Sequence, residues 1–357
     1  MKNKWIFSVL LAVFGLSLAA ACTPEPVGPT TLTVITHDSF AVSDSVVKAF
    51  ESQNNARLVF VMSGDAGSAL NRVILSKDSP QGDVFYGVDN TFLSRAISEG
   101  VFEPYASPEL SKIDAALKLA PNNEALPMDY GDVCINYDKA YFSSHNLAVP
   151  QSLEDLVKPE YGPGSGNTGL LVMENPATSS PGLAFLLATI AHFGEDHYLE
   201  YWKQLKQNGL VVVNDWETAY YTNFSGSSGK GAQPMVVSYA SSPAAEVVYA
   251  STPLTDSPTA SITAEGTCYR QVEFVGILKG TKNQALARKF VDFMLGKQFQ
   301  EDMPLLMFVY PVNPDAVLPE AFVKYATQAN KPALLDPDLV ARKRDQWIAD
   351  WTAAILR

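Results

Sequence analysis

Strand-like runs and helical segments alternate along this chain from residue 32 onward, and this alternation limits the fold more than any other feature of the sequence. In the first hundred residues each β-rich run is followed by a helical apolar pattern, and the pairs are 32–36 with 42–50, 57–62 with 68–75, and 83–88 with 92–99. This order predicts an α/β fold with a largely parallel sheet.

The alternation returns in the second half. Further strands are predicted at 170–173, 211–213, 235–239 and 272–278, and further helices at 182–193, 198–207, 285–295 and 340–356. Two stretches rich in glycine, serine or proline, 161–169 and 225–231, are typical of exposed loops. The length of 357 residues suits about two domains. The hydrophobic content of 47% is enough for buried cores and excludes a wholly disordered chain.

The first residues have the layout of an export signal. Lys2 and Lys4 precede an apolar run and small residues, so residues 1–21 are expected to be a signal peptide. Cys22 follows directly, which suggests lipidation of that cysteine; an ordinary signal peptide cut nearby is the alternative. Residues 22–30 are then the lipidated cysteine and a proline-rich tether. We expect an extracytoplasmic protein, lipid-anchored to the cell membrane or in the periplasm.

The net charge of -12, from 38 acidic and 26 basic residues, excludes nucleic-acid binding through bulk charge. The acidity could attract a cation, or it could simply aid solubility.

Two cysteines remain if Cys22 carries lipid. In an oxidising compartment Cys134 and Cys268 could form a disulfide, and two buried free thiols are the alternative. The sequence has no CxxC spacing, so a zinc site has no support.

The familiar catalytic motifs are missing. The sequence has no GxSxG, no HExxH and no phosphate loop ending in GK[ST], and its four histidines are scattered. The glycine-rich run at 162–166 precedes a predicted strand and not a helix, so it does not fit a dinucleotide-binding turn. The sequence therefore favours a protein that is not an enzyme.

Four predicted strand ends run into a short polar loop and then a helix; these loops are 36–40, 63–68, 178–182 and 239–243. Ligands of α/β sheets bind at the carboxyl ends of strands, near helix N-termini with free N–H groups. Each loop alone is explained by helix capping, with Ser180 and Ser242 as N-caps before Pro181 and Pro243. Two such loops in each half of the chain predict a cleft between two lobes.

Carboxylates and aromatic side chains lie beside these loops. The candidates are Asp38, Phe40, Asp65, Asp89, Asp129, Tyr130, Trp216, Tyr220, Tyr221, Tyr239, Phe308 and Tyr310. Aromatic rings bind flat cations, and carboxylates accept hydrogen bonds from an amino-heterocycle. Taken singly, each aromatic is more often a core residue. Trp216 is the strongest single candidate because it follows Asn214 and Asp215 at a strand end.

Several of these stretches carry a resemblance to a known family. The most specific are DSF at 38–40, TSSPGL at 178–183 and SYASSP at 238–243. From about residue 32 to residue 351 the chain resembles the substrate-binding lipoproteins of bacterial ABC importers, in the two-lobed class with crossed chain topology. Within that class it is similar to the thiamine-binding members.

The resemblance implies an α/β fold of the two-lobed periplasmic-binding-protein type (type II), with the ligand in the cleft between the lobes. Lobe 1 would comprise residues 31–133 and 269–330, and lobe 2 residues 134–268. Residues 331–357 would form a C-terminal helical segment that packs on lobe 1. Cys134 and Cys268 would both lie near the crossover strands, which favours the disulfide.

The resemblance also implies a binding site. The expected ligand-binding residues are His37, Asp38, Phe40, Asp65, Ser179, Ser180, Trp216, Tyr220, Tyr239 and Phe308. An aminopyrimidine would meet carboxylate and aromatic groups, and a thiazolium or phosphate tail would meet hydroxyls and helix starts. Two positions depart from the family pattern. His37 stands where an aromatic residue is common and Phe308 where tryptophan is usual, which bears on stacking and on the form of the vitamin that binds.

The leading expectation is a monomeric capture protein without a cofactor. It would bind thiamine, thiamine monophosphate or thiamine diphosphate and deliver it to an ABC permease and its ATPase. The same fold could instead bind ferric iron, through His37, carboxylates and tyrosines such as Tyr220 and Tyr221, or a polyamine. A third alternative is a secreted enzyme acting on thiamine-like compounds, with Cys134 as its nucleophile and Cys268 as the rival candidate.

Overall fold

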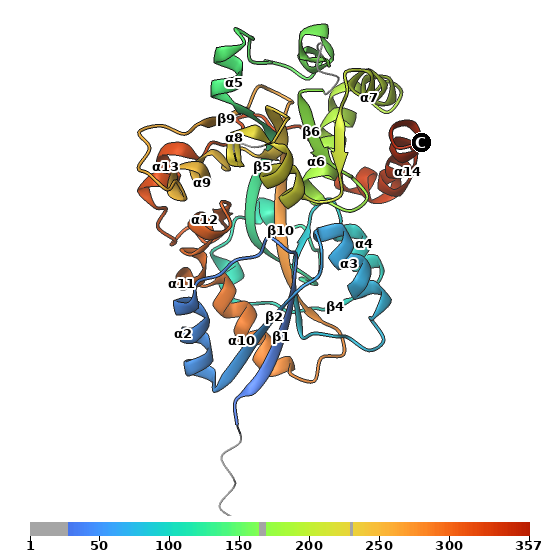
Figure 1. Ribbon diagram of the computed structural model, residues 1–357. Helices are drawn as coiled ribbons and strands as arrows, with labels where there is room; N and C mark the ends of the chain where they lie inside the picture. Colours follow the sequence, from blue (N-terminus) through green and yellow to red (C-terminus); the bar gives the residue numbers. More distant parts are fainter. Residues whose placement is uncertain (1–27, 164–168, 229–230) are drawn as a thin grey trace, which may run out of the picture. The chain divides into compact units, whose positions relative to one another are not determined.

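The computed structural model describes residues 28–163, 169–228 and 231–357. Residues 31–357 form one compact unit (Figure 1). The predicted signal peptide, Cys22 and most of the tether lie outside the described residues, as does part of each predicted loop at 161–169 and 225–231. Within the described part of the chain, no helix is both long enough and apolar enough to cross a bilayer.

Eleven strands of the described residues form one sheet. Its main path runs β2 (Ala56–Met62), β1 (Thr30–Thr36), β3 (Val84–Asp89), β10 (Tyr269–Leu278), β5 (Leu126–Asp138), β8 (Met235–Tyr239), β6 (Leu171–Glu174) and β7 (Val211–Val213). Three short strands lie off this path: β4 (Phe102–Glu103) pairs with β10, and β9 (Thr259–Ile262) and β11 (Tyr310–Pro311) pair with β5.

The expectation of a largely parallel sheet is wrong. Strand β1 pairs parallel with β3, and β6 pairs parallel with β7 and β8, but these are the two ends of the sheet. Between them β10 is antiparallel to both β3 and β5, and β5 is antiparallel to β8. The long strands β5 and β10 carry the chain between the two ends in opposite directions, so they run through the middle of the unit (Figure 1).

Helices cover the sheet at both ends. The longer ones are α2 (Asp44–Asn54), α3 (Ala66–Leu75), α6 (Ser180–Phe193), α7 (Tyr198–Gln207), α10 (Gln284–Leu295) and α14 (Pro337–Ile355). The shorter ones are α4 (Leu93–Ser98), α5 (Lys139–Ser144), α8 (Ser225–Ser228), α9 (Pro243–Val248), α11 (Lys297–Gln300), α12 (Met303–Leu306) and α13 (Glu320–Tyr325). The predicted strands and helices lie within a few residues of these bounds. The predicted loop 225–231 differs, because it begins with the helical turn α8.

Apolar packing explains why these helices form where they do. Helix α2 presents Val46 and Phe50 to the sheet, and the Phe50 ring packs edge-on against Phe290 of α10 at 5.0 Å. Helix α6 is apolar all round and is buried from Ser180 to Ile190, as a helix inside a core must be. Its start lies tight against the end of β6, where a Cβ on Gly182 would lie 2.3 Å from the Glu174 carbonyl oxygen.

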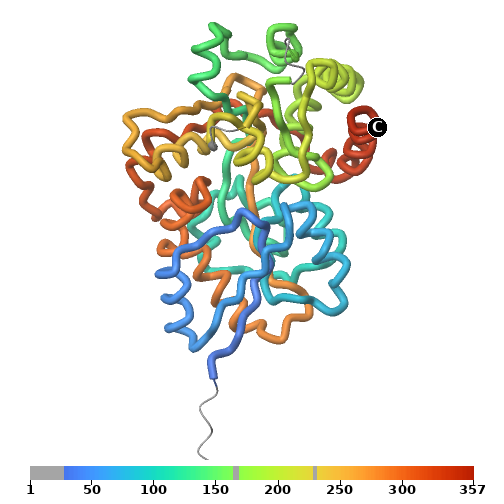
Figure 2. Tube along the Cα trace, in the orientation of Figure 1, coloured from blue at the N-terminus to red at the C-terminus, as the bar shows by residue number. Residues whose placement is uncertain are grey.

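The C-terminal helix differs from expectation in its packing. Residues 331–357 were expected to pack on lobe 1, but α14 packs mainly against α7, within the segment assigned to lobe 2 (Figure 2). The rings of Trp202 and Trp351 meet edge-on at 5.5 Å, and both side chains are fully buried. Large aromatic residues on the inner face of α14 therefore anchor it to α7.

A disulfide joins Cys134 of β5 to Cys268, directly before β10. Both cysteines are fully buried. The bond closes a separation of 134 residues at the point where the two central strands run side by side.

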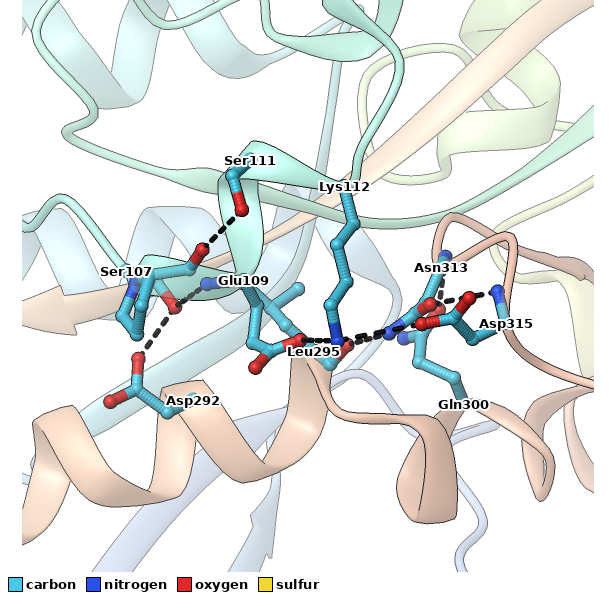
Figure 3. Close-up of polar contacts among 10 residues, drawn as sticks. Ser107, Glu109, Ser111, Lys112, Asp292, Leu295, Gln300, Asn313 and Asp315 are labelled. Atoms are coloured by element: carbon cyan, nitrogen blue, oxygen red, sulfur yellow. Dashed lines mark hydrogen bonds and ion pairs between the residues drawn. The ribbon is translucent and has the colours of Figure 1, made fainter.

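A polar network holds the returning chain against the first end of the sheet (Figure 3). The Lys112 ammonium lies 3.0 Å from Glu109 and 3.4 Å from Asp315. Buried Asn313 donates from its side chain to the Leu295 carbonyl at 2.8 Å, and its backbone N–H donates to Gln300 at 3.1 Å. These bonds fix both ends of the segment that lies between α11 and β11.

Candidate functional site

The four predicted polar loops meet at one cavity of about 260 Å³. His37 comes from the loop after β1, Asp65 from the loop after β2, Ser180 from the start of α6 and Tyr239 from the end of β8. The strand–loop–helix pattern therefore locates the site, because the ends of β1, β6 and β8 converge there.

Most of the expected binding residues line this cavity. They are His37, Asp65, Ser180, Trp216, Tyr220, Tyr239 and Phe308, together with Tyr221 from the wider candidate set. Three expected residues do not line it. The Asp38 carboxylate accepts a hydrogen bond from the Gly64 N–H at 2.8 Å, Phe40 packs against Phe60 and Tyr86, and Ser179 is buried just before α6. These three residues lie in the same loops as the cavity residues His37 and Ser180.

Four other candidates also lie off the cavity surface. The rings of Tyr130 and Tyr310 stack on each other, 5.5 Å apart, where β11 pairs with β5. Asp89 and Asp129 are fully buried, and Asp129 joins a hydrogen-bonded cluster behind the cavity.

An aromatic wall is built around Trp216. Its ring stacks on Tyr220, with centroids 4.9 Å apart and an interplanar angle of 17°. The Trp216 indole N–H donates to the Ser238 hydroxyl at 2.9 Å, and its backbone N–H donates to the Asp65 carboxylate at 3.1 Å. A π-helical turn over Thr218–Asn223 places Tyr220 under the indole; such turns are frequent at functional sites. The result is a rigid aromatic plate on the cavity surface.

The floor of the cavity is acidic. The Tyr86 hydroxyl lies 2.7 Å from Asp129 and 2.7 Å from Glu273, and Glu273 itself lines the cavity. Burial, with the nearby charge of Glu273, raises the pKa of Asp129 well above its ordinary value. Burial therefore favours the protonated form of Asp129, and Glu273 is the member of this pair that lines the cavity.

His37 is the one cavity-lining residue with a basic side chain. Burial acts to lower its pKa, but the charges of Glu273, Asp65 and Asp38 outweigh that effect, so the pKa of His37 is raised. Its Nε2 lies 3.8 Å from Glu273 and has no hydrogen-bond partner among the described residues. The imidazolium form therefore leaves one donor available at the cavity wall.

The start of α6 offers further donors. The helix begins at Ser180, two residues before the predicted bound, so the N-cap is Ser179 and not Ser180 as predicted, and the Ser179 side chain makes no capping bond. Both hydroxyls are buried, and each faces a carboxyl group whose pKa it lowers: Ser179 faces Asp65 and Ser180 faces Asp89. Hydroxyl groups and free N–H groups at a helix start bind anionic or polar ligand atoms.

Sequence reasoning missed several residues that line the cavity, including Glu217, Tyr249, Glu273 and Met307. Glu273 lies inside a strand, Tyr249 follows the last turn of α9 and Met307 follows α12. None of the three stands in a strand–loop–helix junction, so no local pattern marks it. Glu217 is adjacent to Trp216, and that adjacency was the one available signal.

Across residues 28–163, 169–228 and 231–357, no group of three or more histidine, cysteine, aspartate or glutamate side chains is arranged to hold a metal ion. The Tyr220 hydroxyl donates to Glu246 at 2.8 Å, which commits that phenol to a protein partner.

Comparison with known proteins gives one consistent result. The family model for bacterial extracellular solute-binding proteins matches residues 79–330. The "Thiamine-binding periplasmic protein" of Salmonella typhimurium is 32% identical over 350 residues, covering 96% of this chain and 98% of its own. The protein of the same name from Brucella suis is 32% identical over 359 residues, with 98% and 97% coverage.

Solved structures agree with the sequence comparison. A structure titled "Periplasmic thiamin binding protein" superposes with a TM-score of 0.79 at 30% identity, covering 93% of this chain and 100% of the other. A ferric binding protein from Campylobacter jejuni superposes with a TM-score of 0.72, but at 18% identity that likeness shows the fold alone. These matches show the two-lobed α/β fold of type II periplasmic binding proteins.

Proposed function

This chain belongs to the family of bacterial extracellular solute-binding proteins, and we propose that it captures thiamine or a thiamine phosphate and delivers it to the permease of an ABC importer. The location outside the cytoplasm follows from the family. The relatives named above bind thiamine by their own names, and their similarity extends over nearly the whole of this chain.

The observation that carries this proposal is the aromatic plate of Trp216 beside an acidic floor. Tyr220 stacks on the indole and Tyr221 meets it edge-on at 5.4 Å, and Trp216 also lines the cavity, where a flat heterocycle can stack on it. Glu273 and Asp65 place carboxyl oxygens in the same cavity. A flat, positively charged compound with an amino-substituted ring, such as thiamine, is complementary to both features.

The donors at the cavity wall support binding of a phosphorylated form as well. Ser180, at the start of α6, and His37 both line the cavity, and a helix start and an imidazolium suit the oxygens of a phosphate. We propose that thiamine monophosphate fits this cavity as well as thiamine does.

We propose a transport role without catalysis. Cys134 and Cys268 are bonded to each other, so neither sulfur is available as a nucleophile. We propose that the protein acts as a monomer anchored through Cys22. It would close its two lobes around the ligand before it meets the permease.

Calorimetric titration with thiamine, thiamine monophosphate and thiamine diphosphate tests this proposal. Submicromolar binding of at least one form is expected. Trp216→Ala should weaken that binding by about 30-fold, which corresponds to the loss of a ~2 kcal/mol contact. Trp216→Phe is the matched control: it keeps an aromatic plate while losing the bond to Ser238, and should bind within a few-fold of wild type.

A folded protein that gives no heat with any of the three compounds would refute the thiamine assignment. Ferric iron and polyamines would then be titrated in the same way. Visible colour on adding iron would point to the metal instead.

A further inference from the structure

The segment Leu306–Val309 lines the cavity and contains a strained residue. The backbone of Phe308 has a φ of 54°, which lies in the left-handed region. Residues other than glycine and asparagine rarely adopt this conformation. Among the described residues, the others with positive φ are glycines and three asparagines. An aromatic residue stays in this conformation only where its surroundings enforce it.

Hydrogen bonds hold this part of the chain in place. The Ser241 hydroxyl donates to the Phe308 carbonyl oxygen at 2.5 Å, and Ser241 is only 1% exposed. One residue earlier, the Ala41 N–H donates to the Met307 sulfur at 3.1 Å. Further along the chain, the Asn313 N–H donates to the Gln300 side chain, as Figure 3 shows. The bond from Ser241 is thus the contact made to the Phe308 peptide itself, and the other two restrain its neighbours.

The left-handed conformation decides where the Phe308 ring lies. The ring meets Tyr249 edge-on at 5.5 Å, and both residues line the cavity. At an ordinary negative φ the Cα–Cβ bond would point in a different direction, and the ring would leave this surface. The left-handed conformation is thus coupled to the presence of an aromatic group on the cavity surface.

We propose that Ser241 is a positioning residue for ligand binding. Its hydroxyl holds the Phe308 backbone in the left-handed conformation, and this places the Phe308 ring against the ligand. Ser241 itself does not line the cavity, so it acts through Phe308. The ligand part of this inference rests on the proposed function, whereas the backbone part does not.

A stability experiment without ligand tests the backbone part. Phe308→Gly and Phe308→Ala both remove the ring, but only glycine adopts positive φ without strain. With Ser241 in place, the melting temperature of Phe308→Gly should exceed that of Phe308→Ala. When each is combined with Ser241→Ala, the backbone can relax, and the advantage of glycine over alanine should disappear. Equal melting temperatures with Ser241 in place, or an undiminished difference when Ser241→Ala is added, would overturn the proposal.

A binding experiment with thiamine tests the ligand part. Ser241→Ala and Phe308→Ala should each weaken binding by about tenfold, as expected for one aromatic contact. The double variant should bind no more weakly than Phe308→Ala alone, because Ser241 acts through that ring. Additive losses, or full affinity in Ser241→Ala, would contradict this role.

Thr327→Val is a matched control. The Thr327 hydroxyl donates to the Ala240 carbonyl at 2.9 Å, in the same loop as Ser241, but Thr327 does not line the cavity. Its variant should bind thiamine as wild type does. If wild type itself binds no thiamine, the proposed function fails, while the stability cycle still decides whether Ser241 holds the Phe308 backbone.

Discussion

Asp89, at the end of β3, is a fully buried carboxyl with an unusual protonation state. One oxygen accepts hydrogen bonds from the Thr91 hydroxyl at 2.7 Å and from the backbone N–H groups of Thr91 and Phe92, both at 3.2 Å. Burial raises the pKa of Asp89 to about 7, and the charge of Glu273 adds to this effect. The group is therefore neutral in acid and becomes charged near neutral pH.

This protonation makes stability fall as the pH rises. The unfolded chain releases the Asp89 proton near pH 4, whereas the folded protein holds it to about pH 7. Folding therefore takes up a proton between these values, and the free energy of unfolding falls with rising pH across that window, by roughly 4 kcal/mol in all. Asp89→Asn should remove this part of the slope. Urea unfolding at several pH values between 4 and 8 measures it.

Thr91→Val serves as the control for that measurement. It removes one hydrogen bond to the carboxylate and leaves the titrating group in place. Because the bond from Thr91 lowers the pKa of Asp89, its loss should keep the fall in stability and extend it to higher pH, whereas Asp89→Asn should abolish it. An Asp89→Asn variant with the wild-type slope would show that the titration belongs to another group.

Among individual residues, the sequence predicted the site residues that follow strand ends. It missed the site residues that lie inside strands or after short helices. Trp216 and Asp65 stand where turn chemistry leaves a readable pattern. Glu273 is one acidic residue inside an apolar strand, and its role depends on Tyr86 and Asp129, which other strands bring to it. No local pattern contains that information.

Among the elements, β5 was the main one that sequence reasoning failed to predict. It contains Pro127, Gly131 and three aspartates, all of which are uncommon in strands. Pairing with β10, β8, β9 and β11 stabilises it in spite of that composition. Predicting two parallel ends without this strand led to the wrong expectation of a largely parallel sheet.

The disulfide between β5 and the residue before β10 should stabilise the protein without contributing to binding. Closing a loop with a sequence separation of 134 residues limits the unfolded chain, and the chain-entropy model gives about 5 kcal/mol for this length. Replacing both Cys134 and Cys268 by alanine should lower the free energy of unfolding by several kcal/mol. Urea denaturation measures this change.

Thiamine affinity should persist in that double variant. The two cysteines pack in a small buried cluster with Ala240 and Ala329 and do not line the cavity. A folded double variant that no longer binds would show that the bond shapes the site after all.

For the molecule as a whole, the decisive contact is between loops from opposite ends of the sheet. The Gly67 N–H, on α3, donates to the Thr178 carbonyl at 3.1 Å, beside the bond from Trp216 to Asp65. A Cβ on Gly67 would lie 3.0 Å from the Thr178 carbonyl oxygen and 2.9 Å from the Phe92 ring. Glycine at this position lets the two loops meet.

Gly67→Ala should therefore favour a more open arrangement of the lobes. The added methyl group presses on the facing loop, so thiamine should bind about tenfold more weakly, at a cost of ~1.4 kcal/mol in binding free energy. Small-angle X-ray scattering with saturating thiamine should give a larger radius of gyration than wild type. Ser68→Ala, one residue further along α3, should change neither quantity.

The strand order has a consequence for the way this exported chain acquires its structure. Strand β10 lies in the middle of the sheet, between β3 and β5, yet it is made after both of them and after β6, β7 and β8. A chain that crosses a membrane from its N-terminus delivers this strand late. Until β10 is in place, no strand pairs with both β3 and β5, so the two ends of the sheet are not joined there. The contacts that β10 makes join residues far apart in the sequence, and such contacts form slowly. The two ends therefore join into one continuous sheet only once β10 is in place between β3 and β5.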